Sequence, residues 1–342
     1  MPDGSQLSGR LNGNQFRVPR CSQSAVPWGV LMNTKRSGFT LLEVVVIVGV
    51  SGFLMALVAP ATLESREVAR RKTCVKNLKQ IALATHNYHE SHRSFPSGWI
   101  RRPNTSKYVS APFVKETVIP LGKSQTDGQV GVVFGPKPGQ HQEWRLSFDW
   151  SWHAMLLPFM GVKGLKADFD ELKTSPKNLG ALMTEVDSYV CPSARLPAER
   201  PGMFGYSSYR CVMGTRSSNG MMYMNSSVRF ADVKDGTSLT ILVGESLMGL
   251  WGDGYSCCAR IADDNNDNVP DRSTPPRGGR PSAFDTWWTT AGVHYFGFGS
   301  WHADVCHFAF VDGRVKPISK RVDFRVLKAL ATRAGGEAVK VP

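Results

Sequence analysis

A long apolar run constrains the fold of this chain more than any other feature. The run extends from Phe39 to Ala59, and Glu43 is the only ionisable residue within it. At a rise of about 1.5 Å per residue, a helix of that length crosses a hydrocarbon core of about 30 Å. A carboxylate inside such a span costs roughly 2.5–3.5 kcal/mol. Glu43 therefore needs either a cationic partner or a position at the membrane interface.

Basic residues before the run indicate its orientation. Lys35 and Arg36 precede the apolar segment, which favours a cytoplasmic amino terminus for a single-pass protein of the inner membrane. The remainder of the chain would then lie on the extracytoplasmic side. A second basic group follows the run and weakens this asymmetry: Arg66, Arg70, Arg71 and Lys72.

The start of the apolar run carries a motif. Gly38-Phe39-Thr40-Leu41-Leu42-Glu43 resembles the cleavage and methylation motif of type IV prepilins and type II secretion pseudopilins. The resemblance implies that a prepilin peptidase and methylase cuts after Gly38 and methylates the new amine of Phe39. It also implies that Glu43 pairs with that amine on another pilin-like subunit, and that membrane lipid surrounds the helix. An ordinary signal anchor is the alternative interpretation.

The segment before the motif is polar and irregular. We expect residues 1–38 to be a leader that takes no part in the fold. A translation start at Met32 would leave a short leader that ends at Gly38 and resembles those of prepilins. A genuinely long cytoplasmic leader is the alternative.

Helical periodicity continues beyond the apolar run. Residues 39–60 are predicted to form a transmembrane helix, and residues 61–93 an amphipathic stem that ends before Phe95-Pro96, since proline breaks the pattern. The positions expected to face a head domain recur at helical spacing: Cys74, Val75, Leu78, Ile81, Ala82, Thr85 and Tyr88.

Residues 94–342 predict an α+β head, in which the stem helix packs on a mostly antiparallel β-sheet with long loops. Residues 100–149 are interpreted as an irregular insertion, residues 151–159 as a short helix, and residues 187–192 and 239–245 as strands. Residues 305–311 and 314–318 flank Asp312-Gly313, a dipeptide that favours a tight hairpin.

The head carries a second resemblance. Cys191-Pro192-Ser193, Asp235-Gly236-Thr237-Ser238 and Gly244-Glu245 occur in this order, and nine residues separate His302 from Asp312-Gly313. This set is similar to a large bacterial family of prepilin-type proteins with a C-terminal H-x9-DG motif. The head of that family is a domain of unknown function, sometimes labelled solute-binding, so the resemblance implies architecture rather than a reaction.

Two interpretations of His302 and Asp312 remain open. The hairpin would bring them together as a catalytic pair, or Asp312-Gly313 is turn chemistry and His302 packs beside the strand. The sequence contains neither a G-x-S-x-G nor an H-E-x-x-H motif. We therefore expect no enzymatic activity and no catalytic residues.

Metal and disulfide sites are less well specified. Asp263, Asn265, Asp267 and Asp271 alternate along a loop and predict a calcium site, because Ca²⁺ prefers several oxygen ligands on a turning loop. A solvated acidic loop without a metal is the alternative. The stem histidines His86, His89 and His92 favour packing over a metal site. The cysteines are interpreted as free thiols or as disulfides, with Cys191–Cys211 or a bond from Cys257 or Cys258 to Cys306 as alternatives.

Two classes of function follow from these features. The first is a pilin-like structural subunit that assembles through its N-terminal helix. The second is a membrane-tethered module that binds a solute or glycan. An exposed cluster of four tryptophans would support sugar stacking, whereas buried tryptophans would belong to the core: Trp99, Trp251, Trp287 and Trp288. The chain has a net charge of +13, but its basic residues form no motif interleaved with aromatic residues. We therefore expect no nucleic-acid partner.

Overall fold

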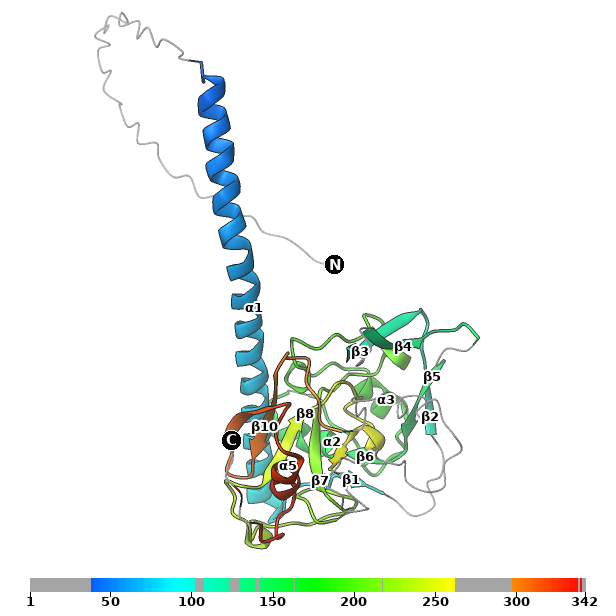
Figure 1. Cartoon of the computed structure of the whole chain (residues 1–342). Helices are drawn as coiled ribbons and strands as arrows, with labels where there is room; N and C mark the ends of the chain where they lie inside the picture. The colour runs from blue at the N-terminus through cyan, green and yellow to red at the C-terminus, as the bar shows by residue number, and fades with distance from the viewer. Residues whose placement is uncertain are drawn as a thin grey trace, which may run out of the picture. The chain divides into compact units, whose positions relative to one another are not determined.

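The computed structural model describes residues 38–101, 108–123, 129–138, 142–162, 164–216, 218–261, 297–337 and 339. The chain divides into two compact units, Met1–Val58 and Ala59–Pro342. The second unit combines helices with mostly antiparallel sheets, so the predicted α+β class is confirmed (Figure 1).

Helix α1 spans Leu41–His92 and contains 52 residues. A capping box closes its first turn. The Thr40 N–H and hydroxyl both donate to Glu43 Oε2, at 2.8 and 3.0 Å, and the Glu43 N–H donates back to Thr40 Oγ1 at 3.3 Å. The helix ends where Arg93 takes a φ of 59°. None of the helices in the described residues has the length and apolar character needed to cross a membrane.

One face of α1 enters the core of the second unit, as its periodicity predicts. Two side-chain amides fix the register of this face, since Asn77 Nδ2 donates to Val190 O at 3.0 Å and Gln80 Nε2 donates to Met160 O at 3.1 Å. Val75 and Tyr88 are half-buried. The buried positions are Cys74, Asn77, Leu78, Ile81, Ala82, Ala84 and Thr85.

The main sheet has five strands in the order β11-β10-β8-β7-β9. Neighbouring strands are antiparallel except for the parallel pair β7 and β9. The central strand β8 is buried at every position, in agreement with its apolar sequence. The strands are β7 (Tyr209–Gly214), β8 (Ile241–Glu245), β9 (Cys258–Arg260), β10 (Val305–Phe310) and β11 (Val315–Ser319).

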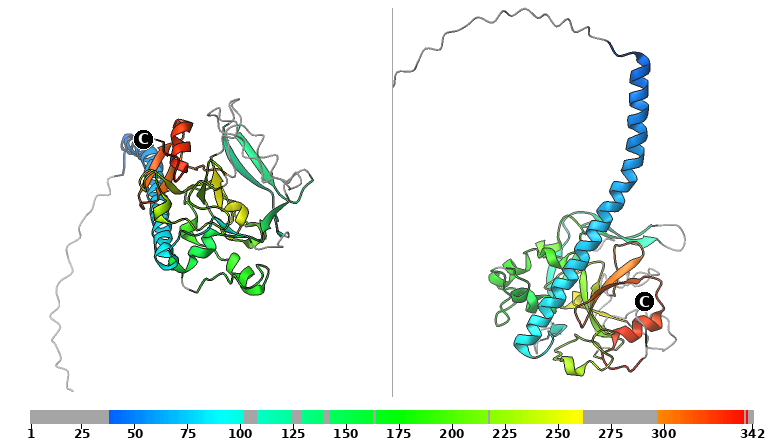
Figure 2. Two further views of the ribbon diagram at one scale, coloured as in Figure 1. Left: turned by 90° about the horizontal axis from the view of Figure 1, so that it is seen from below. Right: turned by 90° about the vertical axis from the view of Figure 1, so that its left-hand side faces the viewer.

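Helices flank this sheet. The C-terminal helix α5 (Phe324–Ala331) begins at the N-cap Asp323, whose side chain accepts from the Arg325 N–H, and it packs against β7. The carboxy-terminal part of α1 runs alongside β10 (Figure 2), where His86 Nε2 lies 2.8 Å from Val311 O. The core therefore lies between the sheet and the buried face of α1.

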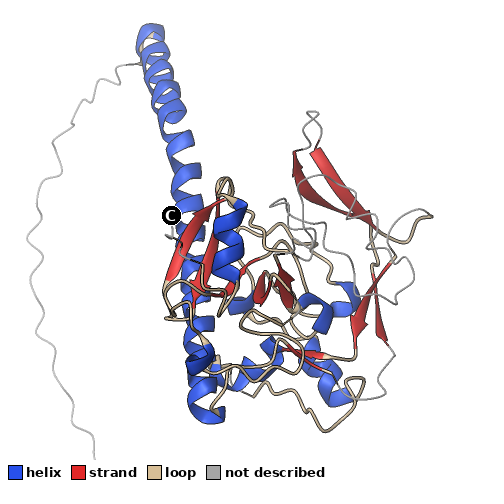
Figure 3. Cartoon of the chain, turned by 60° about the horizontal axis from the view of Figure 1, so that its bottom comes forward, coloured by secondary structure: helices blue, strands red, loops and turns tan. Residues whose placement is uncertain are grey.

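Three small antiparallel sheets correct the prediction for residues 100–149. β1 (Trp99–Ile100) pairs with β6 (Trp150–Ser151), β2 (Tyr108–Pro112) with β5 (Glu143–Ser147), and β3 (Thr117–Lys123) with β4 (Gln129–Phe134). The segment is therefore not irregular, although its strands are separate from the main sheet (Figure 3). Proline and glycine obscure the strand pattern, because the β3–β4 register shifts between Pro120 and Gly122.

The short helices include one confirmed prediction and one correction. α2 (Trp152–Leu156) and η1 (Leu157–Phe159) form the apolar helix predicted over residues 151–159. Residues 187–192 are wrong as a strand, because η2 (Asp187–Tyr189) closes local bonds such as Tyr189 N–H to Val186 O at 2.8 Å. The other short helices are α3 (Pro176–Leu182), η3 (Pro201–Met203), η4 (Phe230–Asp232) and η5 (Gly254–Ser256).

Candidate functional site

His302 lies between two carboxylates in the interior of the second unit. His302 precedes the first residue of β10, Val305, by three positions, and it is 1% exposed. His302 Nδ1 lies 2.6 Å from Glu67 Oε1, and Nε2 lies 3.3 Å from Glu245 Oε1. Both ring nitrogens are therefore held by acids from distant elements, Glu67 on α1 and Glu245 at the end of β8.

Glu67 is the outer acid of this cluster. Besides His302, it receives the Ser193 hydroxyl at 3.1 Å and the Arg70 guanidinium at 2.7 Å. Burial alone would raise the pKa of Glu67. The hydrogen bonds from His302, Arg70 and Ser193 outweigh burial and bring that pKa down to about 2. Glu67 is therefore an anion at neutral pH.

Glu245 is the inner acid and is 1% exposed. Its Oε2 accepts the His307 backbone N–H at 2.8 Å and lies 3.1 Å from His307 Nδ1. Burial would raise the pKa of Glu245, but the hydrogen bonds from His302 and His307 outweigh it and bring the pKa to about 2. A buried charge of this kind is tolerated only because it is fully paired.

The two acids favour a protonated imidazole between them. Burial lowers the pKa of His302, yet its bonds to Glu245 and Glu67 dominate and raise it above the ordinary value. The resulting row of groups, Glu67, His302, Glu245 and His307, connects α1 to β8 and β10. We call it the buried acid–imidazole row.

A disulfide lies beside this row. Cys74 of α1 bonds Cys191, which follows η2, and Cys191 Sγ lies 3.6 Å from His302 Nε2. The suggested pairings Cys191–Cys211 and Cys257 or Cys258 with Cys306 are wrong. Instead the adjacent Cys257 and Cys258 bond each other, and Cys211 and Cys306 are buried thiols. The chain order gives no sign that a stem residue pairs with one 117 positions away.

Asp312-Gly313 forms the turn of the hairpin, as one of the two interpretations predicted. Gly313 takes a φ of 84°, a left-handed conformation that suits glycine, in the hairpin between β10 and β11. The Asp312 carboxylate accepts the backbone N–H and Nε of Arg314, at 3.0 and 2.6 Å. Because His302 instead contacts Glu67 and Glu245, the hairpin does not form the alternative His302–Asp312 pair.

The stem histidines pack among aromatic rings. His86 and His89 stand edge-on or tilted against Phe95 and Phe230, and His92 stacks on Tyr88 with ring centroids 4.0 Å apart. Within the described part of the chain, these histidines form no group of metal ligands. The packing interpretation therefore fits their surroundings.

Several predicted residues lie outside the described ranges. The calcium-loop residues Asp263, Asn265, Asp267 and Asp271 belong to this group, as do Trp287 and Trp288. The calcium site therefore stays a prediction. Of the other two tryptophans, Trp251 is fully buried in the core and Trp99 is half-buried in β1.

Lys173 is a buried ionisable group outside the buried acid–imidazole row. Its ammonium donates to the carbonyls of Ser147 and Asp149, each at 2.7 Å, and lies 4.8 Å from the Trp150 ring centre. Burial lowers the pKa of Lys173 to about 7, although the carboxylates of Asp253 and Asp149 oppose the shift. Lys173 thus joins the loop before α3 to the β5–β6 region.

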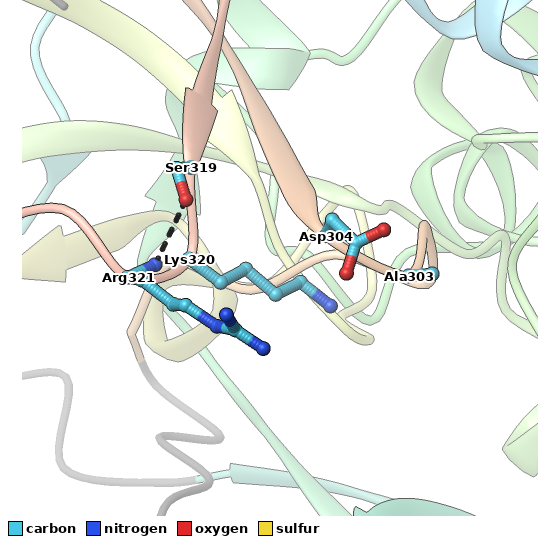
Figure 4. A pocket seen from close by; sticks show the side chains of 5 residues that line it. All are labelled: Ala303, Asp304, Ser319, Lys320 and Arg321. Carbon is cyan, nitrogen blue, oxygen red and sulfur yellow. Dashed lines mark hydrogen bonds between the residues drawn. The ribbon is translucent and has the colours of Figure 1, made fainter.

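A surface pocket of about 330 Å³ adjoins the segment after His302. Its lining consists of Ala303, Asp304, Ser319, Lys320 and Arg321 (Figure 4). The Arg321 backbone N–H donates to Ser319 Oγ at 3.2 Å, and Lys320 Nζ donates to Ser300 O at 2.8 Å. The pocket is therefore polar, and the imidazole of His302 is not part of its lining.

Sequence reasoning missed three members of the buried row: Glu67, Glu245 and His307. Glu245 carried a usable signal, because a lone acid at the end of the apolar strand Ile241–Glu245 requires a buried partner. Glu67 lies among the basic residues of the stem and resembles a solvated acid. Its partner His302 is 235 positions away, so no local pattern links them.

The chain is similar in sequence to several known proteins. The sequence pattern of the family described as protein of unknown function (DUF1559) matches residues 64–325, which contain Glu67 and His302. The type II secretion system core protein G of Aeromonas hydrophila is 29% identical over 98 residues, which cover 29% of this chain and 64% of that protein.

A second relative is the competence protein ComGC of Halalkalibacterium halodurans. It is 26% identical over 91 residues, which cover 27% of this chain and 83% of that protein. No solved structure matches the chain. The matched family covers most of the sequence, so this chain belongs to the DUF1559 family of proteins of unknown function and is a prepilin-like protein.

Proposed function

We propose that this protein is a membrane-anchored pilin-like subunit that is cleaved after Gly38, methylated at Phe39 and assembled through helix α1. The observation that carries the proposal is the exposure of large apolar side chains along the start of α1. Leu41 is 85% and Phe53 67% exposed, and the set includes Val44, Val45, Val46, Ile47, Val48 and Val50. Leaving apolar area in water costs about 25 cal/mol per Å², so these side chains need lipid or another helix.

The capping box at Glu43 supports the assembly role. Thr40 occupies only Oε2 of the carboxylate, and no hydrogen bond to Oε1 occurs within the described residues. Cleavage after Gly38 keeps Thr40 and so keeps the cap. The remaining oxygen is then able to accept the N-terminal amine of a neighbouring subunit.

The disulfides support an extracytoplasmic location for the head. Cys74–Cys191 and Cys257–Cys258 are both buried cross-links of a kind that persists in oxidising compartments. With Lys35 and Arg36 on the cytoplasmic side, residues 39–60 would span the inner membrane. The partners are then the prepilin peptidase and methylase, membrane lipid and other pilin-like subunits. We propose a structural rather than enzymatic role for the head.

Substitution of Glu43 tests this function. Glutamine serves at the third position of a capping box but lacks the charge, so Glu43→Gln should keep the helix start and lose filament incorporation. Glu43→Ala should lose both. Thr40→Val is the matched control, because it removes the hydroxyl partner while leaving the carboxylate for the neighbouring amine.

Mass spectrometry of the purified protein supplies the second measurement. The proposal requires a mature chain that begins with methylated Phe39, and Gly38→Ala should retain the leader. A wild-type chain that begins elsewhere would contradict the processing step. Normal assembly of both Glu43 variants would instead favour a membrane-tethered binding module.

A further inference from the structure

Four ligand-type side chains from separate segments converge at the end of the buried row. They are Cys74 of α1, Cys191 after η2, Glu245 of β8 and His302 before β10, and all four are buried. One ligand atom from each residue lies within 4.8 Å of the other three. The two sulfurs are joined as a disulfide in this structure.

The imidazole of His302 is oriented as a metal-binding imidazole is. Its Nδ1 is held 2.6 Å from Glu67 Oε1, which leaves Nε2 directed at Cys191 Sγ and Glu245 Oε1. Imidazoles that bind metals through one nitrogen almost always donate the other N–H to a carboxylate, a carbonyl or water. Glu67 supplies such a carboxylate.

The carboxylate of Glu245 is oriented in the same way. His307 holds Oε2 through its backbone N–H and Nδ1, at 2.8 and 3.1 Å. The other oxygen, Oε1, therefore faces His302 Nε2 and the cysteine sulfurs. Glu67 therefore fixes the imidazole of His302, and His307 fixes the carboxylate of Glu245.

The spacing of the ligand atoms fits a tetrahedral ion. Zinc bonds to nitrogen, oxygen and sulfur of about 2.0–2.3 Å imply edges of about 3.3–3.8 Å between ligand atoms. Nε2 of His302 lies 3.3 Å from Glu245 Oε1 and 3.6 Å from Cys191 Sγ, and that sulfur lies 3.9 Å from the same Oε1. The two bonded sulfurs must separate to reach such an edge.

We propose that the thiol form of this cluster binds one zinc ion through Cys74, Cys191, Glu245 and His302. Cysteines enter a new chain as thiols, so the zinc form needs no reductant if it precedes oxidation. Zinc binding displaces one proton from each thiol and the Nε2 proton of the His302 imidazolium, and these protons pass to the solvent. From the disulfide, a dithiol reductant supplies two electrons and two protons and itself becomes a disulfide.

Four protein ligands and burial make this a structural site rather than an open catalytic one. The ion would join α1, β8 and the start of β10, and would cross-link the same two cysteine positions as the disulfide. The inference goes beyond the proposed assembly function and depends on neither cleavage nor methylation.

Cobalt binding by the full chain in detergent tests the site. A phosphine reduces the disulfide with water as the oxygen source, the phosphine is then removed without air, and Co²⁺ is titrated. We expect one Co²⁺ per chain, with a thiolate-to-cobalt charge-transfer band and the intense visible bands of tetrahedral cobalt. Zinc should displace the cobalt, and the disulfide form should show no such bands.

Variants separate ligands from orienting groups. Cys74→Ser and His302→Gln should lose the tetrahedral thiolate spectrum. Glu67→Gln should weaken zinc affinity by about 10-fold to 100-fold, because it only orients the imidazole. Glu64→Gln, one turn earlier on an exposed side of α1, is the matched control and should bind like the wild type.

Circular dichroism shows whether the reduced chain is still folded. A reduced chain that stays folded and gives no charge-transfer band would overturn the proposal, as would a band that persists in both His302→Gln and Cys74→Ser. If reduction unfolds the chain, zinc should restore the folded spectrum of the wild type but not of His302→Gln. Failure of that restoration would equally overturn the site.

Discussion

The two halves of helix α1 have opposite surroundings. From Leu41 to Met55 the helix is apolar in sequence, yet its described side chains are exposed. From Glu67 onward the sequence is rich in charge, yet one face is buried. A disulfide, an ion pair and hydrogen bonds from side-chain amides link that face to the head. The hydrophobicity of a helix segment therefore does not show whether that segment packs against the rest of its own chain.

The comparison separates two kinds of stability. Contacts of the stem half contribute to the folding of Ala59–Pro342, whereas the proposed function has the apolar half contact lipid or other subunits. Substitutions in the stem half should then lower the free energy of unfolding of the head. Substitutions in the apolar half should change membrane retention and assembly instead.

Replacing His302 should lower the free energy of unfolding of the head more than any other substitution considered. His302→Ala leaves the carboxylate of Glu245 buried with one partner fewer, and breaking a buried charge pair typically costs about 3–5 kcal/mol. Chemical denaturation monitored by tryptophan fluorescence measures the loss. His92→Ala is the control, since that imidazole is exposed and should cost far less. Equal losses in the two variants would contradict the structural importance of the row.

Removing the stem disulfide should come next. The double variant Cys74→Ser and Cys191→Ser should lower the free energy of unfolding by about 2–5 kcal/mol, because the bond closes a long loop in the unfolded chain. The measurement is made without added metal. A Cys306→Ala variant changes a buried thiol without opening a loop, and it should remain closer to the wild type.

The pH dependence of Lys173 extends the comparison to the interior of the head. Its pKa is about 7 in the folded chain and near 10.5 when unfolded, so between these values the unfolded chain binds the extra proton. Stability from this group therefore rises as pH increases from about 7 to about 10, by at most about 1.4 kcal/mol per pH unit. Lys173→Met should lack that increment when unfolding is measured across the same range.

A polar substitution in the apolar half should have the smallest effect on folding. Val46→Ser should change the free energy of unfolding of the head by less than about 0.5 kcal/mol, because that side chain is exposed. The same variant should reduce retention in the membrane fraction. A large loss of head stability would show that the apolar half packs on its own chain.

Local patterns predicted much of the fold. The buried face at Cys74, Leu78 and Ile81, the strand β8 and the hairpin at Asp312-Gly313 each follow from a period or a dipeptide within a few residues. The strands within residues 100–149 were missed because Pro120 and Gly122 interrupt their alternation.

The candidate site could be predicted only in part. His302 was singled out by its spacing from Asp312-Gly313, but its true neighbours were not. Glu67 and Glu245 come from a helix and a strand far away in the sequence, and their contact with His302 depends on tertiary packing. The disulfide partner of Cys74 was missed for the same reason.

The bond between Cys74 and Cys191 also determines how the molecule carries tension. Residues 75–190 form a closed ring between the two cysteines, and this ring contains the small sheets β1–β6 with α2 and α3. A pull applied to α1 and resisted at the main sheet crosses the sulfur–sulfur bond directly. The ring elements are then relieved of load, so the head can be stretched without its small sheets being drawn out.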